Sequence, residues 1–199
     1  MKIIGIIPCK KHSERLPHKN TLILGDKMLF EWSIEYAISE GIIPVVSTDD
    51  EFVINWCIEN HIDYYKETVN ESNMCNCIDQ VLSQYDCDYF CLLQPTSPLR
   101  KSGMLQEMIL QNYSSSIYTA EKIKIIGHIG NEFITAYRDQ DTSTKFLYHH
   151  DGNMILVNYK WYKQSHKLFD DTSQYILNDK PYSLQIDYKE DFEIITKLI

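Results

Sequence analysis

The sequence predicts an α/β fold, with a single domain over residues 1–199 in which helices surround a mostly parallel central sheet. A chain of 199 residues suits one well-buried domain. Its content of 44% hydrophobic and 24% charged residues is close to that of average globular proteins. Short apolar runs of strand length alternate with segments of helical period, as in successive strand–helix–strand units.

Strands are expected where short runs rich in β-branched residues are bounded by turn residues, because strands buried on both faces of a parallel sheet are apolar throughout. These runs cover residues 2–8, 42–46, 62–65, 89–93 and 154–157. Helices are expected where apolar residues recur at steps of three and four. These segments are 27–40, 51–60 after an N-cap in the turn 47–50, 74–85, 189–199 and a helix for which Ser102 is the N-cap.

Residues 121–150 depart from this alternation. Short β-like pieces at 133–137 and 146–148 lack a helical period. We therefore expect a small irregular β excursion here.

The charge of the chain is distributed unevenly. Its net charge is −9, but residues 1–20 hold five basic residues and one acid, so they carry +4 and the remainder −13. An anionic body should repel nucleic acid and anionic membranes, whereas a cationic loop suits a small polyanion such as a nucleoside triphosphate. No apolar run approaches the roughly 18 residues of a membrane span, so we expect a cytoplasmic protein.

The six cysteines are expected to be free thiols, because a chain of this size with an ordinary core needs no disulfide framework. Their spacing also lacks the C-x-x-C pattern of zinc knuckles.

Ligands of open α/β sheets bind outside the carboxyl ends of the strands. The loops that follow predicted strands, residues 9–20, 47–50 and 94–100, are therefore the candidate functional segments.

Two of these loops carry motifs that resemble the CMP-sugar synthetases, and most closely the acylneuraminate cytidylyltransferases. They are IIPCKKHSERLPHKN at residues 6–20 and LLQPTSPLR at residues 92–100. VSTDD at 46–50, YHHDGNMILV at 148–157 and IDYKEDFE at 186–193 follow in the order of that family. The nine-residue LLQPTSPLR block is the most specific of these motifs.

The resemblance implies a GT-A-like (Rossmann-like) nucleotidyltransferase that transfers CMP from CTP to an acidic, acylneuraminate-like sugar, with Mg²⁺ and release of pyrophosphate. It also implies a homodimer, and it implies that the excursion at residues 121–150 serves dimerisation or substrate contact. Matched residue by residue, the nucleotide would bind at Pro8, Cys9, Lys10, Arg15, Lys19, Asn20 and Lys66, and the sugar at Gln94, Tyr148, His149 and Asp151. Lys10, Lys19 and Asp187 would be catalytic, and Asp187 and Gln185 would be the metal ligands.

Several positions depart from the family pattern. Lys10 stands where the family has an arginine, and Gln185 replaces the first acid of the usual D-x-D. An amide should bind Mg²⁺ less tightly than a carboxylate. His149 and Asp151 replace a sugar-binding arginine and asparagine, so Asp151 would repel a carboxylate substrate unless His149 is protonated.

Other interpretations of the same residues stay open. The basic loop 9–20 could be an ordinary solvated surface, and the PTSP segment at 95–98 could be a rigid turn without a role in binding. Asp187 could be the N-cap of the last helix. Asp49 and Asp50 could bind the metal of a nucleotide-sugar glycosyltransferase, although capping of the following helix is the favoured explanation. The departures also allow a nucleotide-binding paralogue that has lost catalysis.

Overall fold

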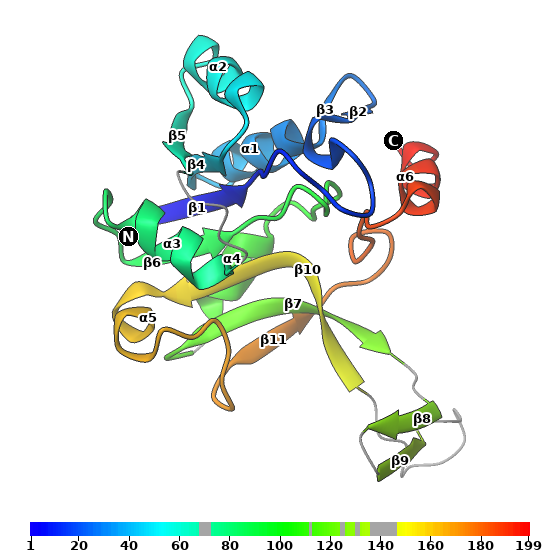
Figure 1. The fold of residues 1–199 in the computed structure, drawn as a ribbon. Helices are drawn as coiled ribbons and strands as arrows, with labels where there is room; N and C mark the ends of the chain where they lie inside the picture. The colour runs from blue at the N-terminus through cyan, green and yellow to red at the C-terminus, as the bar shows by residue number, and fades with distance from the viewer. Residues whose placement is uncertain (68–72, 112, 124–125, 130–131, 136–146) are drawn as a thin grey trace.

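The computed structural model describes residues 1–67, 73–111, 113–123, 126–129, 132–135 and 147–199. Within these residues, a sheet of seven strands forms the centre of the molecule (Figure 1). Its strands, in spatial order, are β11 (Gln174–Leu177), β7 (Ser116–Ile123), β10 (Leu147–Asn158), β6 (Tyr89–Leu92), β1 (Ile3–Pro8), β4 (Ile43–Thr48) and β5 (Asp63–Lys66).

The sheet is mostly parallel, which confirms the predicted fold class. β1 pairs in parallel with β4 and β6, β4 with β5, and β11 with β7. Among the seven strands only β10 runs in the opposite direction, antiparallel to both β6 and β7. The carboxyl ends of β1, β4 and β6 therefore meet at one edge, and the amino-terminal end of β10 reaches the same edge.

Helices cover both faces of the sheet. The face that carries Ile3 and Ile7 packs against α1 (Leu29–Ser39), α2 (Glu51–Glu59) and α4 (Met104–Leu110). The face that carries Ile4 and Ile6 packs against α3 (Met74–Leu82) and α5 (Tyr159–Ser165). Alternate residues of β1 thus point into two cores, as expected for a central strand.

The carboxyl-terminal helix α6 (Lys189–Thr196) joins a third apolar cluster beside the sheet edge. There Ile195 and Ile186 pack against Leu24 and Leu29, which belong to the β2 (Ile23–Leu24) and β3 (Lys27–Met28) hairpin and to the start of α1. This cluster holds the segment before α6 against the loop after β1, where the short 3₁₀ helix η1 (Lys19–Thr21) lies.

The predicted β excursion is present between β7 and β10. Its described part is a hairpin of β8 (Ile126–Ile129) and β9 (Glu132–Thr135), which extends away from the helices in Figure 1. Residues 136–137 and 146 of the predicted β-like pieces lie outside the described residues. No helix in the described part of the chain is both long and apolar enough to cross a bilayer.

Several boundaries differ from the sequence-based expectations for local reasons. The helix expected from residue 27 begins at Leu29, because the preceding residues form a hairpin whose turn contains Gly25 at a φ of +69°. Ser102 is not the N-cap of α4; Gly103 is, at a φ of +79° that glycine adopts without strain. The run 154–157 proved to be the end of a 12-residue strand, β10, with a register shift between His150 and Ile155.

Several elements were not predicted, namely η1, β2, β3, β7, β8, α5 and β11. α5 is seven residues long and begins where the Asn158 side chain accepts a hydrogen bond from the Trp161 backbone N–H, 3.1 Å away. β7 and β11 mix polar and apolar residues, since they form the edge of the sheet beyond the reversed strand.

Candidate active site

The loop after β1 begins with backbone groups that are fixed against the end of β4. The N–H of Cys9 donates to the Ser47 carbonyl at 2.7 Å, and the Thr48 hydroxyl donates to the Cys9 carbonyl at 2.6 Å. Cys9 is fully buried, and burial raises the pKa of its thiol well above the ordinary value. Pro8 and Cys9 thus shape the loop, while the side chain of Cys9 faces the interior.

The following residues fold back over a shallow hollow. The Asn20 amide donates to the Lys10 carbonyl at 2.9 Å, and the Lys11 N–H donates to the Asp49 carboxylate at 2.7 Å. Lys10 and Asn20 line this hollow together with His18. The two hydrogen bonds fix both ends of the loop, so its cationic side chains project from a defined backbone.

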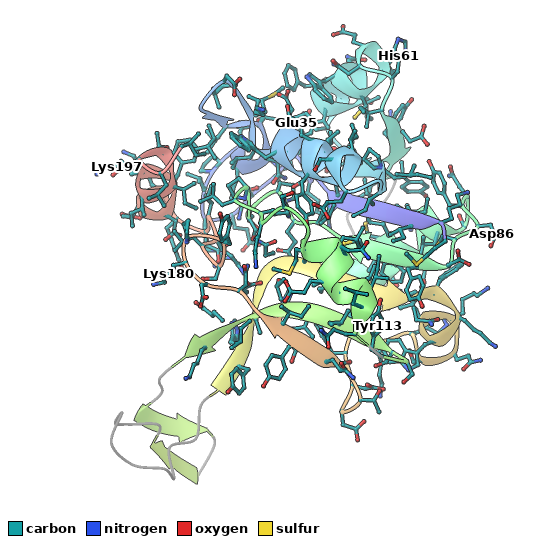
Figure 2. All side chains as sticks on the ribbon, turned by 180° about the vertical axis from the view of Figure 1, so that it is seen from behind. Glu35, His61, Asp86, Tyr113, Lys180 and Lys197 are labelled. Atoms are coloured by element: carbon teal, nitrogen blue, oxygen red, sulfur yellow. The ribbon has the colours of Figure 1, made fainter. Side chains whose placement is uncertain are left out.

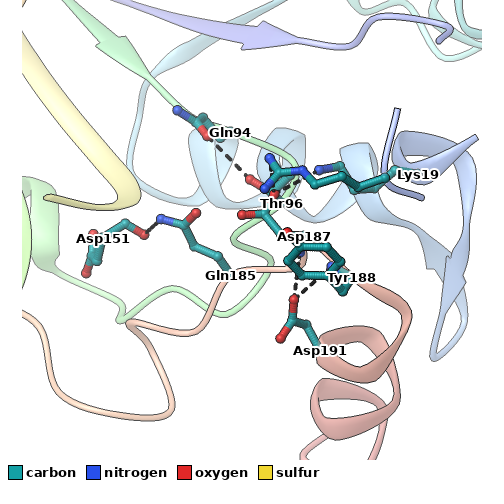
Figure 3. A network of polar contacts seen from close by, with 9 residues as sticks. Lys19, Gln94, Thr96, Asp151, Gln185, Asp187, Tyr188 and Asp191 are labelled. Carbon is teal, nitrogen blue, oxygen red and sulfur yellow. Dashed lines mark hydrogen bonds and ion pairs between the residues drawn. The ribbon is translucent and has the colours of Figure 1, made fainter. Parts of the chain in front are cut away.

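Asp187 meets the cationic loop at the sheet edge (Figure 3). Its Oδ1 atom lies 3.0 Å from an Arg15 guanidinium nitrogen and 3.4 Å from the Lys19 Nζ atom. The Arg15 guanidinium also lies 5.4 Å from the centre of the Tyr188 ring. A hydrogen bond with Tyr188 and the charge of Asp187 raise the pKa of Arg15, which therefore stays charged.

The carboxylate of Asp187 is not the N-cap of α6. The N-cap is Tyr188, and the side chain of Asp191 in the first turn of the helix completes a capping box: its Oδ2 atom accepts hydrogen bonds from the backbone N–H groups of Tyr188 and Asp187, at 2.8 and 3.0 Å. Since Asp191 satisfies these amides, the Asp187 side chain is free to face Arg15 and Lys19. The Asp187 side chain is 32% exposed, and that of Lys19 is 12% exposed.

Gln94 lies in the loop after β6, which is tied to the same segment. The Thr96 hydroxyl donates to the Gln94 Oε1 atom at 3.4 Å, and the Thr96 carbonyl accepts from the Ile186 N–H at 2.8 Å. Because Ile186 directly precedes Asp187, the second contact holds the loop of Gln94 against the segment of Asp187 (Figure 3).

Arg100 was not predicted as a site residue, but its side chain holds the loop of Gln94 in place. Arg100 is half-buried, and its guanidinium donates to the Gln94 carbonyl at 2.7 Å, the Ser33 hydroxyl at 3.0 Å and the Asn153 carbonyl at 3.3 Å. Burial lowers the pKa of Arg100 to about 10, so the group still carries its charge at neutral pH. Arg100 joins the loop of Gln94 to β10.

The Asn153 side chain extends this connection to the segment before α6. Its amide donates to the Leu99 carbonyl at 2.8 Å and to the Tyr182 carbonyl at 2.7 Å. The side chains of Arg100 and Asn153 therefore hold together the loop after β6, β10 and the segment before α6, which are distant in the chain. The one sequence feature that could have indicated this role is that Arg100 is the last residue of the LLQPTSPLR block.

Asp151 lies in the interior, in contrast to the expected position beside a substrate. It is 1% exposed, and its carboxylate accepts from the Thr119 hydroxyl at 2.6 Å, the Asn153 N–H at 3.0 Å and the Asn178 amide at 2.8 Å. Internal donors therefore hold both oxygens. The expected repulsion of a carboxylate substrate by an exposed Asp151 does not arise in this arrangement.

The Gln185 amide nitrogen donates to the Asp151 carbonyl, which turns it toward β10 rather than toward Asp187 (Figure 3). It packs against Gly152, whose φ of +72° and missing side chain leave space for this contact. Gln185 therefore links the segment before α6 to the irregular part of β10. Only its carbonyl oxygen could take part in binding a metal ion.

Tyr148 and His149 point to opposite faces of β10. The Tyr148 ring stacks on Tyr175 at a centroid distance of 4.6 Å. His149 lines a cavity of about 400 Å³ that also reaches Gln185 and Asp187. The structure therefore brings His149, but not Tyr148, to the same cavity as Asp187.

Three further acid and base candidates have local partners. Lys66, at the carboxyl end of β5, forms an ion pair with Glu51. The Asp50 carboxylate caps α2 by accepting a hydrogen bond from the Phe52 N–H at 3.0 Å, as predicted for the turn 47–50. The Asp49 carboxylate holds the loop after β1 through the Lys11 N–H.

Among the described residues no group of three His, Cys, Asp or Glu side chains could hold a metal ion. A further hollow of about 450 Å³ lies at the opposite end of the sheet, beside Asp88 and Lys160, and touches none of the site residues.

Comparisons with known proteins identify the family of the chain. A family model described as "Cytidylyltransferase" matches residues 4–198. The N-acylneuraminate cytidylyltransferase of Streptococcus agalactiae serotype III is 30% identical, and the match covers 96% of this chain and 52% of that protein. The enzyme of the same name from Escherichia coli O18:K1:H7 is also 30% identical, over 97% of this chain and 51% of its own.

The solved structures add the fold. A CMP:2-keto-3-deoxy-manno-octonic acid synthetase complexed with CTP has a TM-score of 0.75 at 15% identity and covers 100% of this chain and 98% of its own. The bifunctional IspDF of Campylobacter jejuni has a TM-score of 0.73 at 14% identity, over 97% of this chain and 54% of its own. The chain spans about half the length of the curated relatives it matches. Because the family match extends over almost every residue, the chain belongs to the cytidylyltransferase family.

Proposed function

We propose that this chain transfers CMP from CTP to an acidic, acylneuraminate-like sugar and releases pyrophosphate. The observation that carries the proposal is the meeting of Arg15 and Lys19 with Asp187, 3.0 and 3.4 Å away, at the carboxyl edge of the sheet. This edge is where ligands of open α/β sheets bind.

The loop after β1 would bind the triphosphate. Phosphoryl transfer depends mainly on positioning the phosphates and on neutralising the charge of their oxygens. Lys19 is largely buried and held beside Asp187, whereas Lys10 and Asn20 line the adjoining hollow. The ammonium group of Lys10 binds phosphate as a point charge, whereas the guanidinium of the family's arginine can bind it through two parallel hydrogen bonds. The phosphate contact of Lys10 therefore has less directional preference.

Mg²⁺ fits the donor set with Asp187 as the single protein carboxylate. Mg²⁺ is commonly held by one or two carboxylates together with substrate phosphates and water. Asp187 presents a partly exposed carboxylate at the cavity, and the Gln185 carbonyl is the one further oxygen that the resemblance assigns. When bound, the ion would neutralise charge on the triphosphate, while Arg15 and Lys19 hold the Asp187 carboxylate in place.

The acceptor would lie in the cavity of about 400 Å³ that borders Asp187. Its anomeric hydroxyl oxygen forms a bond to the α-phosphorus of CTP, the bond from that phosphorus to the β-phosphate oxygen breaks, and the hydroxyl proton passes to solvent. Gln94, held through Thr96 and Arg100, would orient the sugar acid.

We further propose a homodimer in the cytoplasm, where CTP is available. The aromatic face formed by Tyr148, Tyr175 and Phe169 supports a second copy as the partner, because Tyr175 and Phe169 are exposed beside the β excursion. Light scattering coupled to size exclusion would give twice the mass of 23.4 kDa. A monomer would contradict this part of the proposal.

The decisive experiment is a pyrophosphate-release assay with CTP, Mg²⁺ and a panel of 2-keto sugar acids. We expect turnover that requires Mg²⁺ and falls by about 10² to 10³ in Asp187→Ala, the size of loss seen when one group that stabilises transition-state charge is removed. Asp26→Ala, at an exposed turn, is the matched control and should keep full activity.

The same assay separates the other candidate functions. CTP binding in calorimetry by folded protein that turns over no acid would favour a paralogue that has lost catalysis. Asp49 and Asp50 serve as loop and helix contacts, which favours the cytidylyltransferase over a glycosyltransferase. Nucleotide-sugar transfer that is lost in the Asp49→Ala, Asp50→Ala double variant would reverse that preference.

A further inference from the structure

The cavity beside Asp187 contains one cation that no comparison or motif assigns. Lys180 lies on the segment between β11 and α6 (Figure 2) and lines the cavity together with Glu121, His149, Asp187 and Asp191. This segment brings Lys180 into the same cavity as the carboxylate that meets the nucleotide loop.

The other charges of the cavity are mostly compensated within the protein. Asp187 is paired with Arg15 and Lys19, and Asp191 accepts two backbone hydrogen bonds. By contrast, none of the ion pairs and hydrogen bonds in the described part of the chain involves the Lys180 ammonium group. An uncompensated ammonium group on a cavity wall favours an anionic ligand.

We propose that Lys180 binds the carboxylate of the acceptor sugar and thereby determines that the acceptor is an acid. This inference rests on the proposed function. In a 2-keto sugar acid the anomeric carbon carries both the carboxylate and the attacking hydroxyl. A cation that holds the carboxylate therefore also fixes the hydroxyl, which must face the α-phosphate near Asp187.

Lys180 suits this role better than the neighbouring His149. Glu121 faces His149 across the β7–β10 pair, so its carboxylate lies next to the imidazole. Glu121 can accept hydrogen bonds from sugar hydroxyls, and Lys180 is left to recognise the acid group.

The test compares the acceptor KM of the wild type and of Lys180→Met, which keeps the length of the side chain but removes its charge. The probes are N-acetylneuraminate and its methyl ester. We expect the KM for the acid to rise about tenfold, the loss typical of one charged hydrogen bond, while the KM for CTP stays unchanged. The methyl ester should react equally with both proteins, and Lys180→Arg should retain most of the affinity for the acid.

Lys160→Met is the matched control, because Lys160 is exposed and lies at the opposite end of the sheet. An unchanged acceptor KM in Lys180→Met, or an equal loss with acid and methyl ester, would overturn the inference while leaving the proposed function intact. Absence of turnover by the wild type with every 2-keto sugar acid would refute the proposed function, and this inference with it.

Discussion

The two sides of the candidate site are held in different ways. On the nucleotide side, the loop after β1 is fixed mainly by its backbone groups, such as the Cys9 N–H and carbonyl, which pair with β4. On the acceptor side, polar side chains hold the segments together, among them Arg100, Asp151 and Asn153. A cationic side chain of the nucleotide loop, such as Lys19, can therefore change without loss of the contacts of Cys9, whereas a single change on the acceptor side should disturb several segments.

The physical reason for this difference is the direction of β10. Parallel strands that end together place their loops side by side, and their backbone groups pair directly. β10 enters the same edge from the opposite direction and contains a register shift. Its irregular backbone groups need partners, which side chains such as Gln185 and Arg100 supply.

The largest effect is expected for Arg100→Met, which tests the acceptor side. The variant leaves the carbonyls of Gln94 and Asn153 without their donor, so we expect a loss of about 2 to 4 kcal/mol in unfolding free energy. Urea denaturation would measure it. Arg15→Met, at a half-exposed guanidinium on the nucleotide side, is the matched control and should leave the urea midpoint nearly unchanged. Equal midpoints for the two variants would contradict the comparison.

A smaller effect is expected from His150, also on the acceptor side. Burial among Tyr118 and Phe169 lowers its pKa to about 4, although Asp151 opposes the shift and His149 adds to it. Because the unfolded chain takes up this proton near pH 6.5, stability should fall as the pH drops from about 6.5 to 4, by at most about 3 kcal/mol.

His150→Phe tests this dependence in urea denaturation at pH 7 and pH 4. The difference in unfolding free energy between the two pH values should shrink relative to the wild type, while His12→Phe, at an exposed position, should leave it as in the wild type. A wild-type dependence in His150→Phe would show that other groups cause the acid sensitivity.

The smallest effect on stability is expected for Lys19→Ala on the nucleotide side, where the loop keeps its backbone contacts. The variant should instead weaken CTP binding, by about tenfold at low salt and about threefold at high salt, because salt screens a phosphate contact. Calorimetry at both salt concentrations checks this. Lys101→Ala, an exposed lysine paired with Glu107, should bind CTP as the wild type does. Equal losses at both salt concentrations would indicate that Lys19 has a structural role.

Much of the nucleotide side could be predicted, because its signals are local. Buried runs such as that at β1 identify parallel strands without any tertiary information, and the cationic loop follows directly in the chain. Lys19 and Asp187 were both named from motifs, and the structure places them 3.4 Å apart although 168 positions separate them.

The acceptor side was harder to predict, since its polar residues take their roles from distant partners. Nothing near Asp151 in the sequence distinguishes a carboxylate in a cavity from one buried against Thr119 and Asn178, which lie 32 and 27 positions away. Lys180 gave no signal for the same reason, because only the fold brings it into one cavity with Glu121 and His149, which lie on distant strands.

The sequence by itself determined the α/β class, the order of the main strands and helices through α4 apart from η1 and the β2–β3 hairpin, and the candidate loops, since apolar periodicity and turn residues act over a few neighbouring positions. The tertiary structure decided the reversal of β10, the hydrogen-bond partners of Arg100, the burial of Asp151, and the group of side chains that surrounds the acceptor cavity. Burial and hydrogen bonding of a polar group depend on segments far away in the chain, and their meeting is set only when the whole sheet has formed.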